Sequence, residues 1–203
     1  MFDSQIRPFV DRVLNPVARR MVHYGFTANQ VTMMGAVAGV IAAVCASLQL
    51  FDFAFCFILL NRIADGLDGS VARFTKTTDF GGYLDIVSDF IFYSAIPFAF
   101  AIARPETALA AAFLIFSFVG TSTSFLGFAI LAEKRCVSSE IRGKKAFYYL
   151  GGFTEGTETI LLLLAIVIWP DYFIYMAFGF GLLCWCTTLT RIYAAFERFG
   201  KKI

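Results

Sequence analysis

The sequence predicts an all-α integral membrane protein with six transmembrane helices, preceded by an N-terminal amphipathic helix in the membrane interface. Hydrophobic residues make up 59% of the 203-residue chain, and its mean hydropathy is +0.72. The apolar residues fall into six stretches of about twenty, the length that a helix needs to cross a bilayer. Soluble domains contain far fewer apolar residues. We expect a single membrane domain over residues 1–203, without a signal peptide.

Residues 1–25 are the expected interfacial helix. Their apolar side chains recur at helical spacing, at Ile6, Phe9, Val10, Val13, Leu14, Val17 and Met21. Arg12, Arg19 and Arg20 share the other side of this helix. A basic face opposite Phe and Leu is typical of helices that lie on a membrane surface. A solvated amphipathic tail is the alternative interpretation.

The transmembrane helices are expected near residues 28–50, 52–75, 81–103, 107–132, 149–169 and 171–195. The core of the domain then covers residues 28–195, and the connecting segments alternate between the two sides of the membrane. One side holds nearly all the lysines and arginines outside the spans, whereas the opposite turns hold one, Arg104. The positive-inside rule makes the basic side cytoplasmic. We therefore expect a protein of the cytoplasmic (inner) membrane with both termini facing the cytosol.

The first span contains Gly35 and Gly39, a GxxxG pair flanked by alanines. Such pairs let two helix backbones approach closely in a membrane. Small residues are common in transmembrane helices, so a chance match is the alternative. Close packing of this span against a neighbour is the modest inference.

The second span is apolar only over residues 53–60 and becomes polar on one face from Asn61 onward. That face carries Arg62, Asp65, Asp68 and Arg73. Asp65 and Asp68 are three residues apart, so they project from the same side of the helix. Charged residues rarely enter membrane helices without a function.

The third span begins after a tight turn over residues 76–82, where Thr78 or Asp79 can cap the new helix. Asp85 and Asp89 lie within its first two turns and also share a face. The short turn makes the second and third spans antiparallel neighbours. All four aspartates should therefore meet near the cytoplasmic surface.

Four carboxylates in a small volume repel one another unless cations neutralise them. Carboxylate ligands without histidine favour magnesium, manganese or calcium. The one histidine of the chain, His23, lies in the interfacial segment, so a zinc site is not expected. Gly66, Gly69 and Ala72 leave the helix backbone accessible, and Arg73 offers a planar fork for phosphate oxygens. The combination predicts a site for a diphosphate.

The pattern Asp65-x2-Asp68-Gly69-x2-Ala72-Arg73, followed by Gly81-x3-Asp85-x3-Asp89, resembles the signature of the CDP-alcohol phosphotransferase (phosphatidyltransferase) family. The spacing is fixed over eight residues, and the sequence matches each of them. The length, the six spans and the interfacial helix are also similar to that family, so the resemblance covers nearly the whole chain.

The resemblance implies a role for each matching residue. Two divalent ions, Mg²⁺ or Mn²⁺, would bind to Asp65, Asp68, Asp85 and Asp89, and Asp89 would also deprotonate the acceptor hydroxyl. The CDP moiety would contact Gly69 and Arg73, with Gly81, Thr78 and the Asn29-x2-Thr32 motif completing the nucleotide site. Helix capping is the alternative for Asn29 and Thr32.

The family's reaction implies a function in phospholipid biosynthesis. The expected donor is CDP-diacylglycerol, the acceptor is an alcohol, and CMP is released. We also expect a homodimer surrounded by membrane lipids and no nucleic acid partner. A cation transporter that uses the aspartates as an ion site is the alternative from another class, and an inactive membrane scaffold is a third possibility.

The sequence leaves open which alcohol is the acceptor. A phosphorylated acceptor would favour a basic pocket, for which the candidates are Arg142, Lys144, Lys145 and Arg191. Glu155 and Glu158, near the start of the fifth span, disfavour a doubly anionic acceptor. They could instead bind the hydroxyls of a polyol, bind a cationic headgroup, or pair with Arg191.

Overall fold

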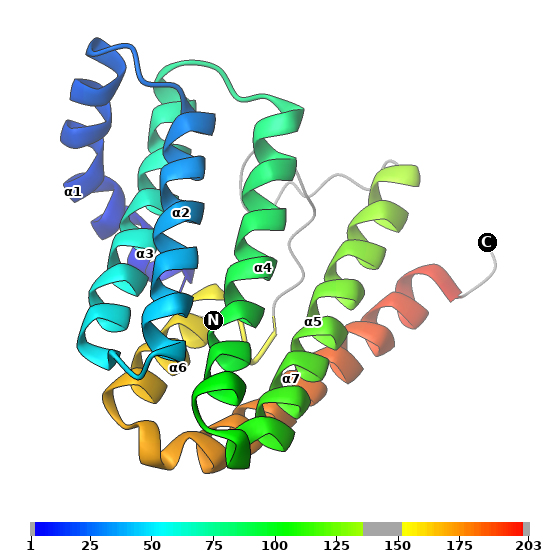
Figure 1. Ribbon diagram of the computed structural model, residues 1–203. Coiled ribbons are helices and arrows are strands. Elements are labelled where there is room, and N and C mark those ends of the chain that lie inside the picture. Colours follow the sequence, from blue (N-terminus) through cyan, green and yellow to red (C-terminus); the bar gives the residue numbers. More distant parts are fainter. Residues whose placement is uncertain (1–2, 136–151, 201–203) are drawn as a thin grey trace.

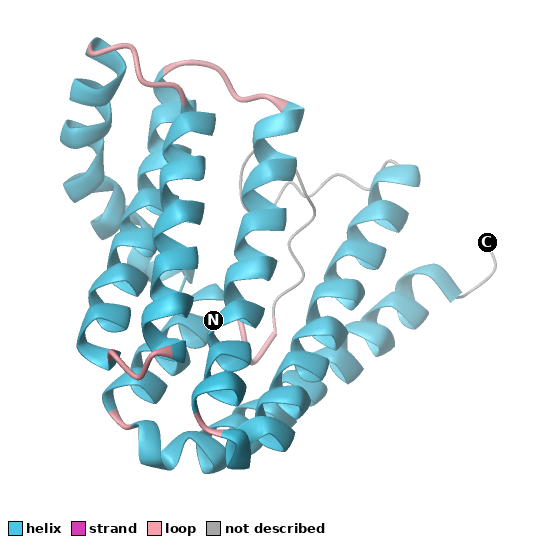
Figure 2. Cartoon of the chain, viewed as in Figure 1, coloured by secondary structure: helices cyan, strands magenta, loops and turns pink. Residues whose placement is uncertain are grey.

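All regular secondary structure in the described part of the chain is helical (Figures 1 and 2). The computed structural model describes residues 3–135 and 152–200, with side chains from residue 12 onward. The seven α-helices of these residues are α1 (Asp3–His23), α2 (Ala28–Ser47), α3 (Phe51–Phe74), α4 (Asp79–Ala103), α5 (Ala108–Lys134), α6 (Gly156–Ile168) and α7 (Phe173–Ala195). Short helical turns at Pro105–Thr107, Pro170–Tyr172 and Phe196–Gly200 extend α5 and α7.

Four segments of the described residues are long and apolar enough to cross a membrane: Ala28–Ser47, Asp79–Ala103, Pro105–Lys134 and Pro170–Gly200. Helix α3 has 24 residues, but its second half is charged. Helix α6 has 13 residues, and residues 152–155 before it are not helical, so the predicted start of that span at residue 149 is wrong for these four positions. The prediction of an all-helical membrane protein is confirmed, and the number of six spans stays a prediction.

The helices pack in two groups that meet at α4 and α5 (Figure 1). Helix α2 packs against both α3 and α4, while α1 lies along α3 and α7 lies along α5. A Cβ atom at Gly39 would lie 2.8 Å from the Phe92 ring of α4 and 3.2 Å from the Asn61 amide of α3. The GxxxG pair therefore brings α2 close to its neighbours, as predicted.

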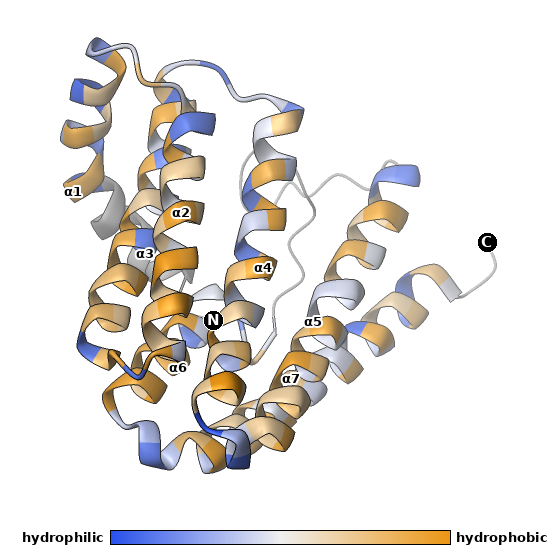
Figure 3. Ribbon diagram, viewed as in Figure 1, coloured by the Kyte–Doolittle hydropathy of each residue, from blue (hydrophilic) through white to orange (hydrophobic). Residues whose placement is uncertain are grey.

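The apolar core lies toward the ends of α3 and α4 that are far from the turn joining them. Phe100 of α4 stacks on Phe173 of α7 at 4.4 Å between ring centroids and on Phe51 of α3 at 5.4 Å. Toward the turn, α3 and α4 instead carry hydrophilic segments, drawn blue in Figure 3. The two ends of the same helices thus differ in chemistry.

Helix α1 packs on the bundle through Ala18, which is buried together with Val31 and Val71. Its residues Val13 and Val17 are exposed, and the Arg19 guanidinium lies 5.0 Å from the Phe74 ring centroid. The helix predicted over residues 1–25 is present from Asp3 to His23. Its location in the membrane interface stays a prediction.

Candidate active site

The turn between α3 and α4 is fixed by a helix cap. The Thr78 hydroxyl accepts a hydrogen bond from the Gly81 amide at 3.0 Å, so the predicted cap of α4 is Thr78 and not Asp79. Helix α2 packs against both α3 and α4, and side chains of α3 and α4 also meet directly, with Arg62 Nη2 2.8 Å from Asp89 Oδ1. The two helices are therefore neighbours through their side chains, as expected. Space remains between them for the acidic side chains and a ligand.

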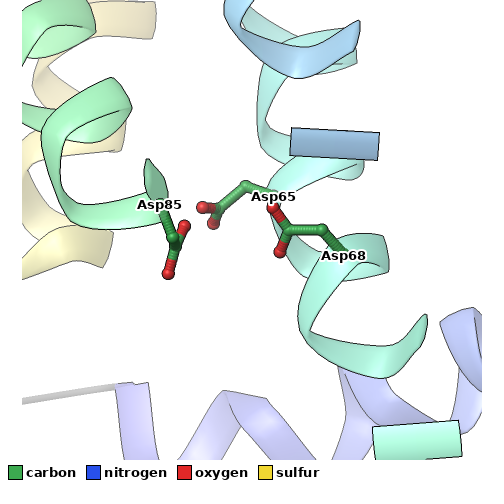
Figure 4. A group of neighbouring side chains, drawn as sticks. All are labelled: Asp65, Asp68 and Asp85. Atoms are coloured by element: carbon green, nitrogen blue, oxygen red, sulfur yellow. The ribbon is translucent and has the colours of Figure 1, made fainter. Parts of the chain in front are cut away.

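Three of the predicted aspartates meet in that space. The carboxylate oxygens of Asp65, Asp68 and Asp85 lie within 4.8 Å of one another. Figure 4 shows Asp85 reaching from α4 toward Asp65 and Asp68 on α3. Opposite oxygens around Mg²⁺ are about 4.2 Å apart and those around Ca²⁺ about 5 Å apart. These three residues therefore fit a hard divalent cation with little movement.

Helix α2 supports this cluster through Thr32. Its hydroxyl donates to the Asp68 carboxylate at 2.5 Å, and Asp68 is only 6% exposed. The cap of α2 is Thr27, which forms a reciprocal capping box with Gln30. The capping alternative therefore does not explain Thr32, which contacts a carboxylate of the cluster.

Asp89 is not part of this three-carboxylate group. Its Oδ1 accepts a hydrogen bond from Arg62 Nη2 at 2.8 Å, and its Oδ2 accepts one from the Tyr93 hydroxyl at 3.1 Å. The same arginine lies 3.7 Å from Asp65. Arg62 and Tyr93 thus hold the Asp89 carboxylate beside the group of three, and the four aspartates do not form one symmetric cluster.

Arg62 and Tyr93 are residues for which the sequence predicted no role. The position of each residue in the sequence could have indicated a contact with the aspartates. Arg62 precedes Asp65 by three residues on the polar face of α3, and Tyr93 follows Asp89 by four residues on α4. Spacings of three and four residues place side chains together on a helix.

A cavity of about 160 Å³ opens beside the cluster, with Asp68 and Asp85 in its wall. Five of the six residues predicted to bind CDP line it, namely Asn29, Thr32, Gly69, Thr78 and Gly81. A Cβ atom at Gly81 would lie 2.9 Å from the Asn29 side-chain oxygen, which is too close, so only glycine fits at this position. We call this space the nucleotide-side cavity.

The sixth predicted residue, Arg73, does not line the nucleotide-side cavity. Its Nη2 donates to the Ser70 hydroxyl at 2.9 Å. Lys76, in the turn between α3 and α4, does line this cavity. The cavity wall therefore carries a positive charge, which Lys76 supplies in place of the predicted Arg73.

A second cavity, of about 240 Å³, is lined by Asp89 and Tyr93 of α4 together with residues of α5, α6 and α7. Among the predicted acceptor residues, Glu155 and Arg191 line it, and Glu158 does not. Lys144 lies outside the described residues. We call this space the acceptor-side cavity. It meets α4 at Asp89, one helical turn from Asp85 in the nucleotide-side cavity.

The two glutamates have a structural role at the start of α6. Glu155 and Glu158 form a capping box, in which the Glu158 carboxylate accepts from the Glu155 amide at 3.1 Å. Glu155 also accepts a hydrogen bond from the Gly152 amide at 3.1 Å. Arg191 donates to the Thr121 carbonyl oxygen at 2.9 Å and lies 5.7 Å from the Phe125 ring centroid.

Comparison with known proteins identifies the family. The chain is 44% identical to inner membrane protein YnjF of Escherichia coli over 197 residues, covering 97% of this chain and 96% of that protein. It is 26% identical to the archaetidylinositol phosphate synthase of Pyrococcus horikoshii, covering 96% of this chain and 97% of that enzyme.

Solved structures share the fold. The phosphatidylinositol phosphate synthase of Mycobacterium tuberculosis with CDP-DAG bound matches with a TM-score of 0.71 at 23% identity, covering 91% of this chain and 94% of that one. The same synthase in complex with manganese and citrate matches with a TM-score of 0.68 at 23% identity, covering 89% and 87%. The family model for CDP-alcohol phosphatidyltransferase matches residues 26–192. The chain therefore belongs to the CDP-alcohol phosphatidyltransferase family, as its aspartate signature predicted.

Proposed function

We propose that this enzyme transfers a phosphatidyl group from CDP-diacylglycerol to a small alcohol and releases CMP, as a step of phospholipid biosynthesis. The observation that carries this proposal is the cluster of Asp65, Asp68 and Asp85, with a cavity at each of two successive turns of α4. One cavity suits the donor nucleotide and the other suits the acceptor. The CDP-DAG bound to the mycobacterial synthase supports the choice of donor.

The nucleotide-side cavity can hold the CDP headgroup while the acyl chains remain in the bilayer. Gly69 and Gly81 let the ligand approach the backbone, and Asn29 and Thr78 offer hydrogen-bonding groups. Lys76 contributes a positive charge for the diphosphate. Arg73 lies one helical turn from Gly69, and we keep it as a CDP-binding residue that must leave Ser70 to reach the ligand.

Two divalent ions, Mg²⁺ or Mn²⁺, are the proposed cofactors, held by Asp65, Asp68 and Asp85 with Asp89 as the fourth ligand. The manganese in the mycobacterial synthase supports this proposal. Bound ions neutralise the diphosphate and stabilise the charge that develops on the leaving CMP. Thr32 keeps the Asp68 carboxylate oriented by its hydrogen bond.

Asp89 is the proposed general base. It stands in the wall of the acceptor-side cavity, where it can take the proton of the acceptor hydroxyl. The acceptor oxygen then forms a bond to the lipid phosphorus as the bond from that phosphorus to the oxygen of CMP breaks. The proton remains on Asp89 until solvent removes it.

The acceptor-side cavity favours a small alcohol with several hydrogen-bonding groups. Its wall contains the hydroxyls of Thr121, Ser122 and Thr159, together with Glu155 and Arg191. Such a wall suits a polyol, and Arg191 can in addition attract a single phosphate. Glu158 would affect acceptor binding indirectly, through the cap of α6. Lys144, outside the described residues, is retained as a candidate acceptor-binding residue.

We further propose six membrane spans, with α3 and the region of α6 completing the four apolar segments, and α1 in the cytoplasmic interface. The basic residues Arg73 and Lys76 at the turn between α3 and α4 support a cytosolic active site. Cysteine labelling from each side of sealed vesicles tests this orientation. The homodimer implied by the family resemblance is tested by light scattering of the purified protein.

The test of the function is a CMP-release assay with purified enzyme, CDP-diacylglycerol and Mg²⁺. The acceptor panel contains inositol, inositol phosphate, glycerol, glycerol phosphate and serine. We expect CMP and a new phospholipid with one class of acceptor, and neither product from Asp68→Asn. Cation flux into proteoliposomes without CMP formation would support the transporter instead. The acids lie in the halves of α3 and α4 that are nearer the turn joining these helices, whereas transporters tend to hold ions at the membrane midplane.

The substitutions Glu155→Gln and Arg73→Ala test acceptor binding and donor binding separately in the same assay. Glu155→Gln should change the KM or the ranking of the acceptors, because Glu155 lines the acceptor-side cavity. Arg73→Ala should raise the KM for CDP-diacylglycerol. Equal weakening of donor binding by both substitutions would contradict the assignment of the cavities.

A further inference from the structure

We propose that Arg62 is a positioning residue that holds the Asp89 carboxylate in place for the transfer reaction, an inference that rests on the proposed function. The Arg62 guanidinium uses all three of its nitrogens. Nε donates to the Asn61 side chain at 2.7 Å, Nη1 donates to the Tyr93 hydroxyl at 3.1 Å, and Nη2 donates to Asp89 at 2.8 Å. A planar guanidinium with a hydrogen bond from each of its nitrogens is held in one orientation.

The surroundings of Arg62 are built to keep it there. Its side chain is only 9% exposed, and its guanidinium carbon lies 4.8 Å from the Phe92 ring centroid and 5.3 Å from that of Tyr93. Asn61 is itself fixed, because its amide donates to the Gly35 carbonyl of α2 at 2.8 Å. A chain of contacts therefore runs from α2 through α3 to Asp89 on α4.

Both oxygens of Asp89 are engaged on one side. Arg62 binds Oδ1 and Tyr93 binds Oδ2. Each carboxylate oxygen has two lone pairs, so each retains one that is not used by these bonds. The Asp89 side chain is 26% exposed and stands in the wall of the acceptor-side cavity. The network therefore fixes the carboxylate and still leaves it able to accept a proton.

Arg62 also balances the charge of the acidic site. Asp89 shares this end of α4 with Asp85 and faces Asp65 on α3, and like charges at such a site repel one another. Arg62 lies 2.8 Å from Asp89 and 3.7 Å from Asp65. Without this cation, repulsion would turn Asp89 away from the cluster. The acceptor hydroxyl would then meet a misplaced base.

The test compares Arg62→Met, Arg62→Lys and Tyr93→Phe, each in the native protein and in Asp89→Asn. We expect Arg62→Met to lower turnover by about 10- to 100-fold, the usual effect of losing a group that orients a metal ligand. The KM for CDP-diacylglycerol should change little, and Arg62→Lys should recover part of the turnover. In the Asp89→Asn background, Arg62→Met should cause no further loss, because it acts through Asp89.

Arg104→Met is the matched control. Arg104 also forms an ion pair, with Asp171 at 2.7 Å, and lies 5.6 Å from the Phe51 ring centroid. It belongs to the other end of the bundle, so its loss should leave turnover unchanged. If Arg62→Met does not fold, Arg62→Lys and Tyr93→Phe form the same cycles with Asp89→Asn.

Thermal unfolding of the same variants gives a readout that does not need activity. A positioning contact predicts that the Tm losses of Arg62→Met and Asp89→Asn are less than additive. If the native protein transfers the phosphatidyl group and the turnover losses of Arg62→Met and Asp89→Asn are additive, only the role of Arg62 is overturned.

If the native protein releases no CMP, the proposed function and the role of Arg62 in it are both overturned. The Tm values of the single and double variants would then measure only the contact between Arg62 and Asp89.

Discussion

The two halves of helix α3 pack against the same neighbour, α2, with opposite chemistry. In the first half, Ala54 and Ile58 are completely buried and contribute to the apolar core. From Asn61 onward, which we call the second half, the buried residues include Asn61, Asp68 and Ser70. The first half is held by close packing of apolar side chains, whereas the second half adds hydrogen bonds and ion pairs to the packing of Val71 on Ala18 and Val31.

The difference separates stability from activity. Stacked rings and small residues give the first half its dispersion contacts, which drive helix association where lipid competes for apolar surface. The second half gathers charges that repel one another, and it forms part of the wall of the nucleotide-side cavity. Substitutions in the charged half should therefore remove activity with the fold intact, and substitutions in the apolar half should do the reverse.

The largest effect is expected from Asp68→Asn. The substitution removes a charge from the cluster proposed to hold the metal ions, and a bound ion would contribute several kcal/mol to stabilising the transition state. Turnover should fall by about a thousand-fold or more. CMP release at saturating Mg²⁺ measures this loss, and a chelator should abolish the activity of the native protein.

Asp79→Asn is the control for that substitution. Asp79 undergoes the same change of charge in the first turn of α4, but it is exposed and does not line either cavity. We expect it to retain native turnover. Full CMP release after chelation would contradict a metal-dependent cluster, whatever the two variants do.

Asp89→Asn should come next and should affect turnover much more than donor binding. Asparagine keeps one oxygen that can accept from Arg62, but it cannot take up the proton of the acceptor. Turnover should fall by about two to four orders of magnitude, the range for removal of a general base, with donor binding in Mg²⁺ near its native value. A parallel loss of donor affinity would show that Asp89 acts mainly as a metal ligand.

In the apolar half, Phe100→Ala should destabilise the protein. Phe100 is completely buried and stacks on Phe173, so its removal leaves a cavity. The free energy of unfolding should fall by about 3 kcal/mol, measured by denaturation in detergent. Turnover per folded molecule should stay native. Phe98→Ala, two residues away on the exposed face of α4, is the matched control and should cost little.

Much of this architecture could be predicted from the sequence. The expected second and third spans, 52–75 and 81–103, agree within two residues with Phe51–Phe74 and Asp79–Ala103. These boundaries depend on local signals, namely apolar runs and a capping threonine. The aspartate cluster also followed from local spacing, because two residues one helical turn apart must share a face.

The remaining features depend on how the helices are placed in space. The pairing of Asp89 with Arg62 joins α4 to α3, so it depends on how the two helices are placed relative to one another. No spacing within a single helix shows which cation will reach which carboxylate. In the same way, the spacing of Glu155 and Glu158 did not show that their carboxylates accept backbone hydrogen bonds at the start of α6. Their role in acceptor binding stays a prediction.

The smallest expected effect is at Gly39 of α2, which packs beside Asn61, where the two halves of α3 meet. The added Cβ of Gly39→Ala would meet the buried Phe92 ring at 2.8 Å. That ring cannot shift freely, because the Arg62 guanidinium lies over its face. Overpacking costs about 1–3 kcal/mol, and the better helix propensity of alanine offsets up to about 1 kcal/mol. We expect a small loss of stability together with a several-fold loss of turnover.

Gly127→Ala provides the control, because a Cβ atom there would meet nothing within 4 Å. The same glycine-to-alanine change in α5 should leave turnover native and should not lower the Tm. Because Gly39 touches the ring that supports Arg62, its substitution should affect both stability and activity, unlike Phe100→Ala or Asp68→Asn. If Gly39→Ala instead lowered the Tm with native turnover per folded molecule, the apolar packing of α2 would not be coupled to the orientation of Asp89.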